Sequence, residues 1–161
     1  MIRGYISIGS NIDKDKNIAA GLKALEQAFG KLIVSSVYES DPVGFMGDAF
    51  YNLAVGFDSD LDVKTIAQKL REIEFAHGRL PDSKKFSDRQ LDLDLLLYGD
   101  LVVNDGNLQI PRVDIERYAF VLEPLAEIAP TLIHPVLQLT YAKLWQNLPK
   151  VGVKQQRIGG L

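Results

Sequence analysis

Two acidic residues, Asp92 and Asp94, lie inside an aliphatic stretch that reads RQLDLDLLLYG from Arg89 to Gly99. Side chains alternate along a strand, so both carboxylates should share one face, about 6–7 Å apart, opposite a core-facing leucine row that ends at Leu97. Such a pair repels and is suited to sharing divalent cations. Mg²⁺ takes one or two carboxylates and completes its shell with water and phosphate oxygens. The stretch therefore predicts a Mg²⁺ site that also receives a phosphorylated ligand.

Four cationic side chains, Arg79, Lys84, Lys85 and Arg89, precede or begin this stretch. Guanidinium and ammonium groups complement the charge of a polyphosphate, and two Mg²⁺ ions bridging a triphosphate would offset charge as a phosphorus is attacked. A second interpretation stays open on spacing alone. The two acids could be the solvent side of a half-exposed strand, and each cation an ordinary surface residue.

The elements that must position these residues follow from hydrophobic periodicity. Apolar residues four and then three apart predict a helix from about Ile18 to Phe29, with Asp13 or Asp15 capping its start. A second helix should begin at Asp62 and end before Gly78. The remaining stretches with alternating or β-favouring residues predict strands at 4–8, 31–38, 51–57 and 91–97. The polar stretch from Leu80 to Asp88 predicts a surface loop that closes over the ligand.

The C-terminal third contains a predicted hairpin at residues 104–107 and helical segments at 124–128 and 141–148. The order β-α-β-β-α-β predicts an α+β fold, a ferredoxin-like (split βαβ) αβα sandwich with a mainly antiparallel sheet and a C-terminal extension. With 161 residues, of which 47% are hydrophobic, the chain is predicted to form one domain, residues 1–161.

Composition excludes several classes of function. The net charge of −3 gives no broad electrostatic reason to bind nucleic acid or an anionic membrane. The chain has no cysteine and two histidines. Thiolate chemistry is therefore excluded, and a zinc site is not expected. A leader segment and a membrane-spanning stretch are both missing from the sequence, which predicts a cytoplasmic protein, and we expect a monomer.

Three motifs in the right order and spacing resemble one family. They are Ile8-Gly9-Ser10-Asn11, the Arg89-x-x-Asp92-x-Asp94 block, and Phe120-Val121-Leu122-x-Pro124-Leu125. Together they are similar to the 6-hydroxymethyl-7,8-dihydropterin pyrophosphokinases of folate biosynthesis, from about Ile2 to Trp145. The resemblance implies that ATP donates a pyrophosphoryl group to the pterin hydroxymethyl oxygen and releases AMP, with two Mg²⁺ ions bound by Asp92 and Asp94.

The same resemblance implies roles for further residues. Arg79 and Arg89 are expected to contact the transferring phosphates and act with Asp92 and Asp94 as the catalytic set. The positions that match the pterin slot are Ser40, Pro42, Val43, Phe50, Asn52 and Phe120. The positions expected to contact ATP are Glu74, His77, Lys85, Arg89, Leu95, Arg112 and Tyr118.

Several positions depart from the family pattern. Phe86-Ser87-Asp88 replaces Trp-Gly-Pro before Arg89, and Pro81 replaces an arginine of the loop. Arg112 replaces a histidine, and Tyr118 replaces an arginine. These changes leave two alternatives to a working pyrophosphokinase: a divergent paralogue that binds pterin or nucleotide without efficient transfer, and a metal enzyme that acts on a different nucleotide.

Overall fold

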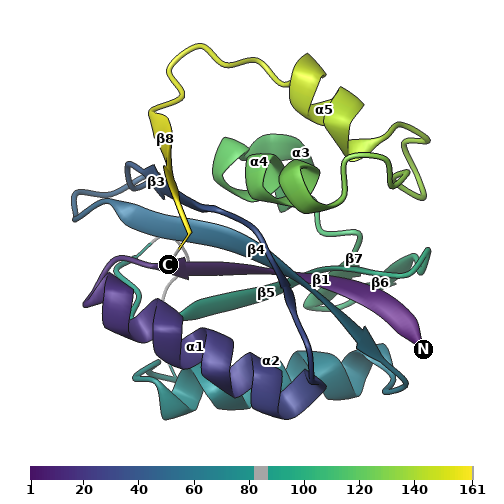
Figure 1. The fold of residues 1–161 in the computed structure, drawn as a ribbon, viewed down its shortest axis with the longest axis horizontal. Coiled ribbons are helices and arrows are strands. Elements are labelled where there is room, and N and C mark those ends of the chain that lie inside the picture. Colours follow the sequence, from purple (N-terminus) through teal and green to yellow (C-terminus); the bar gives the residue numbers. More distant parts are fainter. Residues whose placement is uncertain (82–86, 161) are drawn as a thin grey trace.

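The computed structural model describes residues 1–81 and 87–160 and forms a layered α+β structure (Figure 1). Its elements in chain order are β1 (Ile2–Ser10), α1 (Lys14–Phe29), β2 (Ile33–Val34), β3 (Val37–Ser40), β4 (Phe50–Ser59), α2 (Val63–Ala76), β5 (Asp92–Tyr98), β6 (Val103–Asp105), β7 (Leu108–Ile110), α3 (Asp114–Arg117), α4 (Ala119–Ile128), α5 (Tyr141–Asn147) and β8 (Gln155–Gly159).

The main sheet has the strand order β5-β1-β4-β3-β8, and β2 also pairs with β4. Each pairing in it is antiparallel. Helices α1 and α2 cover one face, and α3, α4 and α5 lie over the other (Figure 1). The predicted α+β sandwich with a mainly antiparallel sheet is therefore confirmed, and β6 and β7 form the predicted hairpin.

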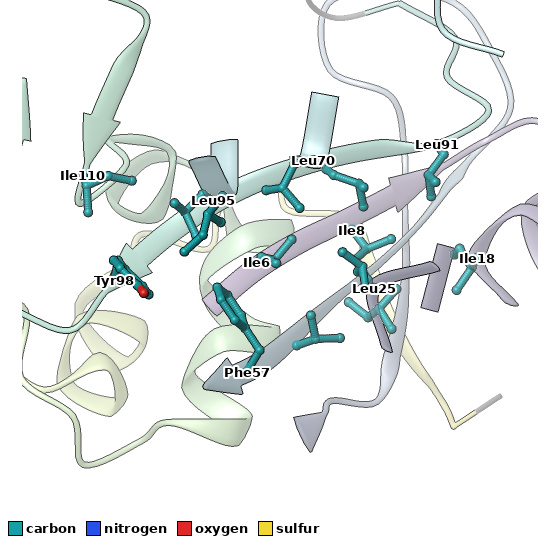
Figure 2. Close-up of a cluster of buried hydrophobic side chains, with 14 of the residues drawn as sticks. Ile6, Ile8, Ile18, Leu25, Phe57, Leu70, Leu91, Leu95, Tyr98 and Ile110 are labelled. Atoms are coloured by element: carbon teal, nitrogen blue, oxygen red, sulfur yellow. The ribbon is translucent and has the colours of Figure 1, made fainter. Parts of the chain in front are cut away.

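Two hydrophobic clusters hold these layers together because alternate residues of each strand face opposite sides. On one face, Ile6 and Ile8 of β1 pack with Leu25 of α1 and Leu70 of α2 (Figure 2). On the other face, Tyr5 packs with residues of α4 that include Leu125. The polar residues of the sheet that face α4 therefore lie beside the second cluster.

The predicted leucine row on β5 is wrong at one position. Leu91, Leu93 and Leu95 pack under α1 and α2, but Leu97 joins Leu96 in the cluster beneath α4. The pairing with β1 shifts by one residue at this point, from Ile6 opposite Leu95 to Tyr5 opposite Leu97. Such a β-bulge inserts an extra residue and reverses the facing of those that follow.

The stretch predicted as one strand over 31–38 is divided into β2 and β3. Ser35 interrupts it, because its hydroxyl accepts a hydrogen bond from the Ala54 amide and its own amide donates to the Ala54 carbonyl. The amide and the hydroxyl of Ser36 both donate to Glu127 of α4. Side-chain bonds thus replace the strand ladder where α4 meets the sheet.

The helix starts differ in how well they follow the predictions. Asp62 caps α2 by accepting a hydrogen bond from the Thr65 amide at 2.8 Å. Asp13 occupies the cap position of α1 without a side-chain cap bond. Helix α4 begins at Ala119, five residues before the predicted start at Pro124. Strand β8 and the short helix α3 were not predicted.

Within residues 1–81 and 87–160, no helix is both long and apolar enough to span a lipid bilayer.

Candidate active site

A cavity of about 580 Å³ opens on the α4 side of the sheet, where β5, β1 and β4 lie next to one another. Side chains from the sheet, from the end of α2 and from the start of α4 line it. Its lining residues are Ser7, Gly9, Ser40, Asp41, Val43, Phe45, Phe50, Asn52, Arg71, Phe75, Arg79, Pro81, Ser87, Arg89, Asp92, Asp94, Asn107, Arg112, Asp114, Phe120 and Val121. The volume is within the range of small-molecule sites in proteins.

A single cross-strand row connects Asp92 with Asn52 through Gly9. Asp92 of β5 lies opposite Gly9 of β1, and Gly9 lies opposite Asn52 of β4. Directly opposed residues point to the same face of a sheet, and neighbouring strands are about 4.8 Å apart. Asp92 and Asn52 are therefore only two strand spacings apart. A Cβ atom on Gly9 would lie 3.2 Å from Oδ1 of Asn52, so the missing side chain keeps this floor open.

Burial places the two carboxylates of β5 under electrostatic strain. Removal from water, and then the charge of Asp92, raise the pKa of Asp94 to about 7. Burial, followed by the charge of Glu74, raises the pKa of Asp92 as well. The charged form of each carboxylate is therefore destabilised, and a cation that binds between them would lower this free-energy cost.

One guanidinium offsets part of this charge. Arg112 Nη2 lies 3.7 Å from Asp94 Oδ1, and Arg112 Nε lies 3.4 Å from Asp114 Oδ2. Asp114 is itself buried at the start of α3. Arg112 thus lines the acidic part of the cavity and faces carboxylates on two sides.

The carboxylates of the cavity suit a Mg²⁺ ion only if a bound substrate supplies further oxygen ligands. Among the described residues, no group of three or more His, Cys, Asp or Glu side chains is arranged to hold a metal ion. Asp92 and Asp94 are both partly exposed to the cavity and supply carboxylate oxygens. Mg²⁺ commonly uses one or two carboxylates and takes its remaining ligands from water and phosphate. The two aspartates could hold such an ion beside a bound polyphosphate.

A buried carboxylate organises the cationic wall. Glu74 of α2 is completely buried, and its Oε1 accepts hydrogen bonds of 2.7 Å from both Arg71 and Arg79. Its Oε2 accepts a bond of 2.8 Å from the Leu93 amide on β5. This carboxylate therefore ties two cavity-lining arginines to the strand that carries the acidic pair. Arg79 also lies over the ring of Phe75.

The opposite end of the cavity is suited to a flat polar ring. Asn52 is buried and donates from Nδ2 to the Ser40 hydroxyl at 2.7 Å. Phe50 packs edge-to-face against Phe45 with ring centroids 6.2 Å apart. Phe120 projects from the first turn of α4 and lines the same space. Aromatic faces together with an amide can recognise a heteroaromatic ring by its faces and its edge.

The buried side chain of Asn11 connects the backbone of Arg89 to the loop that precedes β4. Its Nδ2 donates to the Asp48 carbonyl at 3.1 Å and to Asp88 Oδ1 at 2.7 Å. Its Oδ1 accepts a bond of 2.7 Å from the Arg89 amide, and its own amide donates to the Arg89 carbonyl. The residue thus fixes the backbone of Arg89 next to the loop that precedes β4.

Asn11→Ala is expected to lower turnover about tenfold or more, because Arg89 is expected to contact substrate phosphates and small displacements of such a group are costly for catalysis. Steady-state measurement of AMP release from ATP would show it. Asn17→Ala is the matched control, since the side-chain amide of Asn17 donates to the Ile12 carbonyl at an exposed position. Equal turnover in the two variants would contradict the role given to Asn11.

The structure brings most residues selected from the sequence into this one cavity. The acidic pair lies on one strand face with Asn52 and Phe120 nearby, as predicted. The selected residues that line it are Ser40, Val43, Phe50, Asn52, Arg79, Arg89, Asp92, Asp94, Arg112 and Phe120. Lys84, Lys85 and Phe86 lie outside the described residues.

Among the residues that the structure describes, some selected positions do not line the cavity. The Glu74 carboxylate is fully enclosed, so it acts through the arginines that it binds. The Leu95 side chain packs in the core under α1 and α2, so only its backbone could meet a ligand. Among the described lining residues, Pro42, His77 and Tyr118 do not occur. His77 Nδ1 instead lies 2.7 Å from the Ile73 carbonyl, and Tyr118 stacks on Phe120.

Other lining residues were not predicted from the sequence. Arg71 lies on the same face of α2 as Glu74, at an i,i+3 spacing, and Phe75 directly follows Glu74. This spacing is the signal that was available for them. Phe45 lies in an irregular loop and Asp114 begins a four-residue helix. Neither segment has a periodicity from which its facing could be predicted.

Comparison with known proteins points to the same family as the sequence motifs. The family described as 7,8-dihydro-6-hydroxymethylpterin-pyrophosphokinase (HPPK) matches residues 5–130. A Haemophilus influenzae protein named 2-amino-4-hydroxy-6-hydroxymethyldihydropteridine pyrophosphokinase is 35% identical over 143 residues, which cover 86% of this chain and 89% of that protein. The Pseudomonas aeruginosa protein of the same name is 35% identical over 137 residues, covering 83% of this chain and 84% of the other.

Longer proteins also match. The folic acid synthesis protein FOL1 of Dictyostelium discoideum is 35% identical over 150 residues, which cover 92% of this chain and 23% of that protein. The crystal structure of wild-type Plasmodium falciparum HPPK-DHPS has a TM-score of 0.75 at 14% identity, and the match covers 97% of this chain and 48% of that chain. At this identity the structural match shows a shared fold.

Proposed function

Because this chain belongs to the 7,8-dihydro-6-hydroxymethylpterin-pyrophosphokinase family, we propose that it transfers the pyrophosphoryl group of ATP to 6-hydroxymethyl-7,8-dihydropterin in folate biosynthesis. The hydroxymethyl oxygen attacks the β-phosphorus, the bond to the α-phosphate oxygen breaks, and AMP leaves. One observation carries the proposal. A single cavity joins an acidic and arginine-lined half, suited to a metal-bound triphosphate, to an aromatic and amide half, suited to a pterin.

The pterin half acts by orientation. Asn52 is held by Ser40, so its remaining amide oxygen is available to the edge of the pterin ring. Phe120 and Phe50 supply faces for stacking, and Val43 adds an apolar contact. With the ring fixed in this way, its hydroxymethyl group would project toward the β5 side of the cavity. Holding acceptor and donor in one geometry is a main source of rate in phosphoryl transfer.

The phosphate half acts by charge. Arg79 and Arg89 line the cavity and would bind phosphate oxygens through forked hydrogen bonds. Asp92 and Asp94 would hold up to two Mg²⁺ ions, and bound Mg²⁺ supplies neutralisation of the charge on the phosphates. Arg112, already paired with Asp94, would remain close enough to contact the same phosphates. A loose transition state makes little demand on a general base.

Incubation with ATP, Mg²⁺ and the hydroxymethyl dihydropterin tests the proposal through its products. We expect stoichiometric AMP and pterin diphosphate from the wild type, and no AMP from Asp92→Ala. Release of ADP would contradict pyrophosphoryl transfer. Tight pterin binding without AMP would instead identify the divergent binding protein.

We also propose that residues 1–161 form one domain and act as a cytoplasmic monomer. The layered packing around two adjoining clusters supports the single domain.

A further inference from the structure

The C-terminal strand β8 lies against the part of the site that is assigned to the pterin. It forms the edge of the main sheet and pairs with β3, where Gln155 is directly opposite Ser40. The amide of the next residue, Asp41, donates to the Lys154 carbonyl. Strand β8 thus supports the backbone at the point where β3 ends and the cavity loop begins.

Gln155 differs from its neighbours on this strand. Residues 156–158 are exposed, whereas Gln155 is half-buried. Its side-chain nitrogen donates to the Ala119 carbonyl at 3.1 Å and to Glu123 Oε1 at 2.7 Å. Both acceptors belong to the first turns of α4. The two amide hydrogens of one glutamine are therefore used on two partners in the same helix.

These contacts connect the two walls of the pterin slot. Ser40, opposite Gln155 on β3, accepts the hydrogen bond that orients Asn52. Ala119, whose carbonyl accepts from Gln155, immediately precedes Phe120. Gln155 consequently spans the gap between the strand that fixes the amide of the slot and the helix that carries its aromatic face.

We infer that Gln155 is a positioning residue for the pterin, which sets the separation between Phe120 and the Ser40–Asn52 pair. The inference rests on the proposed function and deepens it. A hydrogen bond to a charged acceptor is stronger than a neutral one, so the bond to Glu123 should dominate this restraint. The residue touches neither phosphate-binding wall, so its influence should be confined to the pterin.

Gln155→Leu removes both donors while leaving a side chain of similar bulk. The expected result is an increase of about tenfold in the dissociation constant of 6-hydroxymethyl-7,8-dihydropterin, measured by calorimetry with Mg²⁺ and an unreactive ATP analogue. The dissociation constant of the analogue itself should change less than twofold. In turnover, KM for the pterin should rise while KM for ATP stays constant.

Two further variants separate positioning from general stability. Gln155→Lys keeps a donor able to reach Glu123 and should retain pterin affinity within about threefold, which restores most of the loss. Gln156→Leu, the exposed neighbour on β8, should behave as wild type. Melting temperatures of all variants show whether each protein is folded.

The outcomes distinguish this inference from the function on which it rests. Unchanged pterin affinity in Gln155→Leu overturns the inference, and so does an equal loss of pterin and nucleotide affinity. If the wild type binds no pterin and releases no AMP, the proposed function itself fails.

Discussion

Asp94→Asn is expected to reduce AMP formation by at least about 10³-fold while it raises the melting temperature of the ligand-free protein at pH 8. Asparagine has nearly the same shape but no charge to bind a cation. Metal-assisted charge neutralisation is worth several kcal/mol in a transition state, and each 1.36 kcal/mol is a factor of ten in rate. The loss should appear in single-turnover measurements at saturating Mg²⁺.

The gain in stability follows from the direction of the pKa shift. Burial, and then the charge of Asp92, raise the pKa of Asp94 from 3.8 to about 7. The folded state therefore binds the proton more tightly than the unfolded chain, and stability is lost as the pH rises from about 4 to 7. The uncharged asparagine of the variant removes this penalty at pH 8. Because Asp94 is a quarter exposed and faces Arg112, we expect about 1 kcal/mol, or a few degrees.

Thermal unfolding at pH 4 and pH 8 checks this part of the prediction. The variant should gain stability over wild type at pH 8 and show little difference at pH 4. Adding Mg²⁺ with an unreactive ATP analogue should stabilise the wild type more than the variant. Asp100→Asn, at an exposed turn, is the control. A variant that melts below wild type at pH 8 would show that Asp94 stabilises the free protein.

The fold was largely predictable because its periodic elements are long and their two faces differ. On β4, Leu53 and Val55 face one way and Asn52 the other, as alternation requires. The failures occur where a local hydrogen bond or an extra residue overrides the period. Ser35 replaced a ladder bond with its side chain, and the bulge near Leu96 reversed Leu97.

The site was predictable to the extent that its residues belong to regular strands. Asp92, Asp94 and Asn52 could be placed on faces from sequence alone, but that Asp92 and Asn52 share one cross-strand row through Gly9 depends on strand order. Glu74 shows the opposite limit. The resemblance implied that it contacts ATP, whereas its carboxylate is buried and compensated by two arginines and one strand amide. Such compensation depends on tertiary contacts that periodicity does not encode.

Glu74→Ala is expected to cost about 3–5 kcal/mol of stability, the typical effect of removing one partner from a buried charged pair. The substitution leaves the Leu93 amide without its acceptor on the outer edge of β5, and it frees Arg79 and Arg71. The melting temperature should fall by about 10 °C or more. Chemical denaturation gives the free energy of unfolding directly, provided that the slope against denaturant is unchanged.

Glu72→Ala is the matched control, because Glu72 lies on the same helix and its contact with Gln68 is exposed. It should change stability by no more than about 0.5 kcal/mol. Glu74→Gln should fall between the two, since it keeps acceptor and shape but loses the charge that holds two guanidinium groups. A Glu74→Ala protein as stable as the Glu72→Ala protein would show that β5 and its acidic pair keep their place without this carboxylate, and that Arg79 is positioned by other contacts.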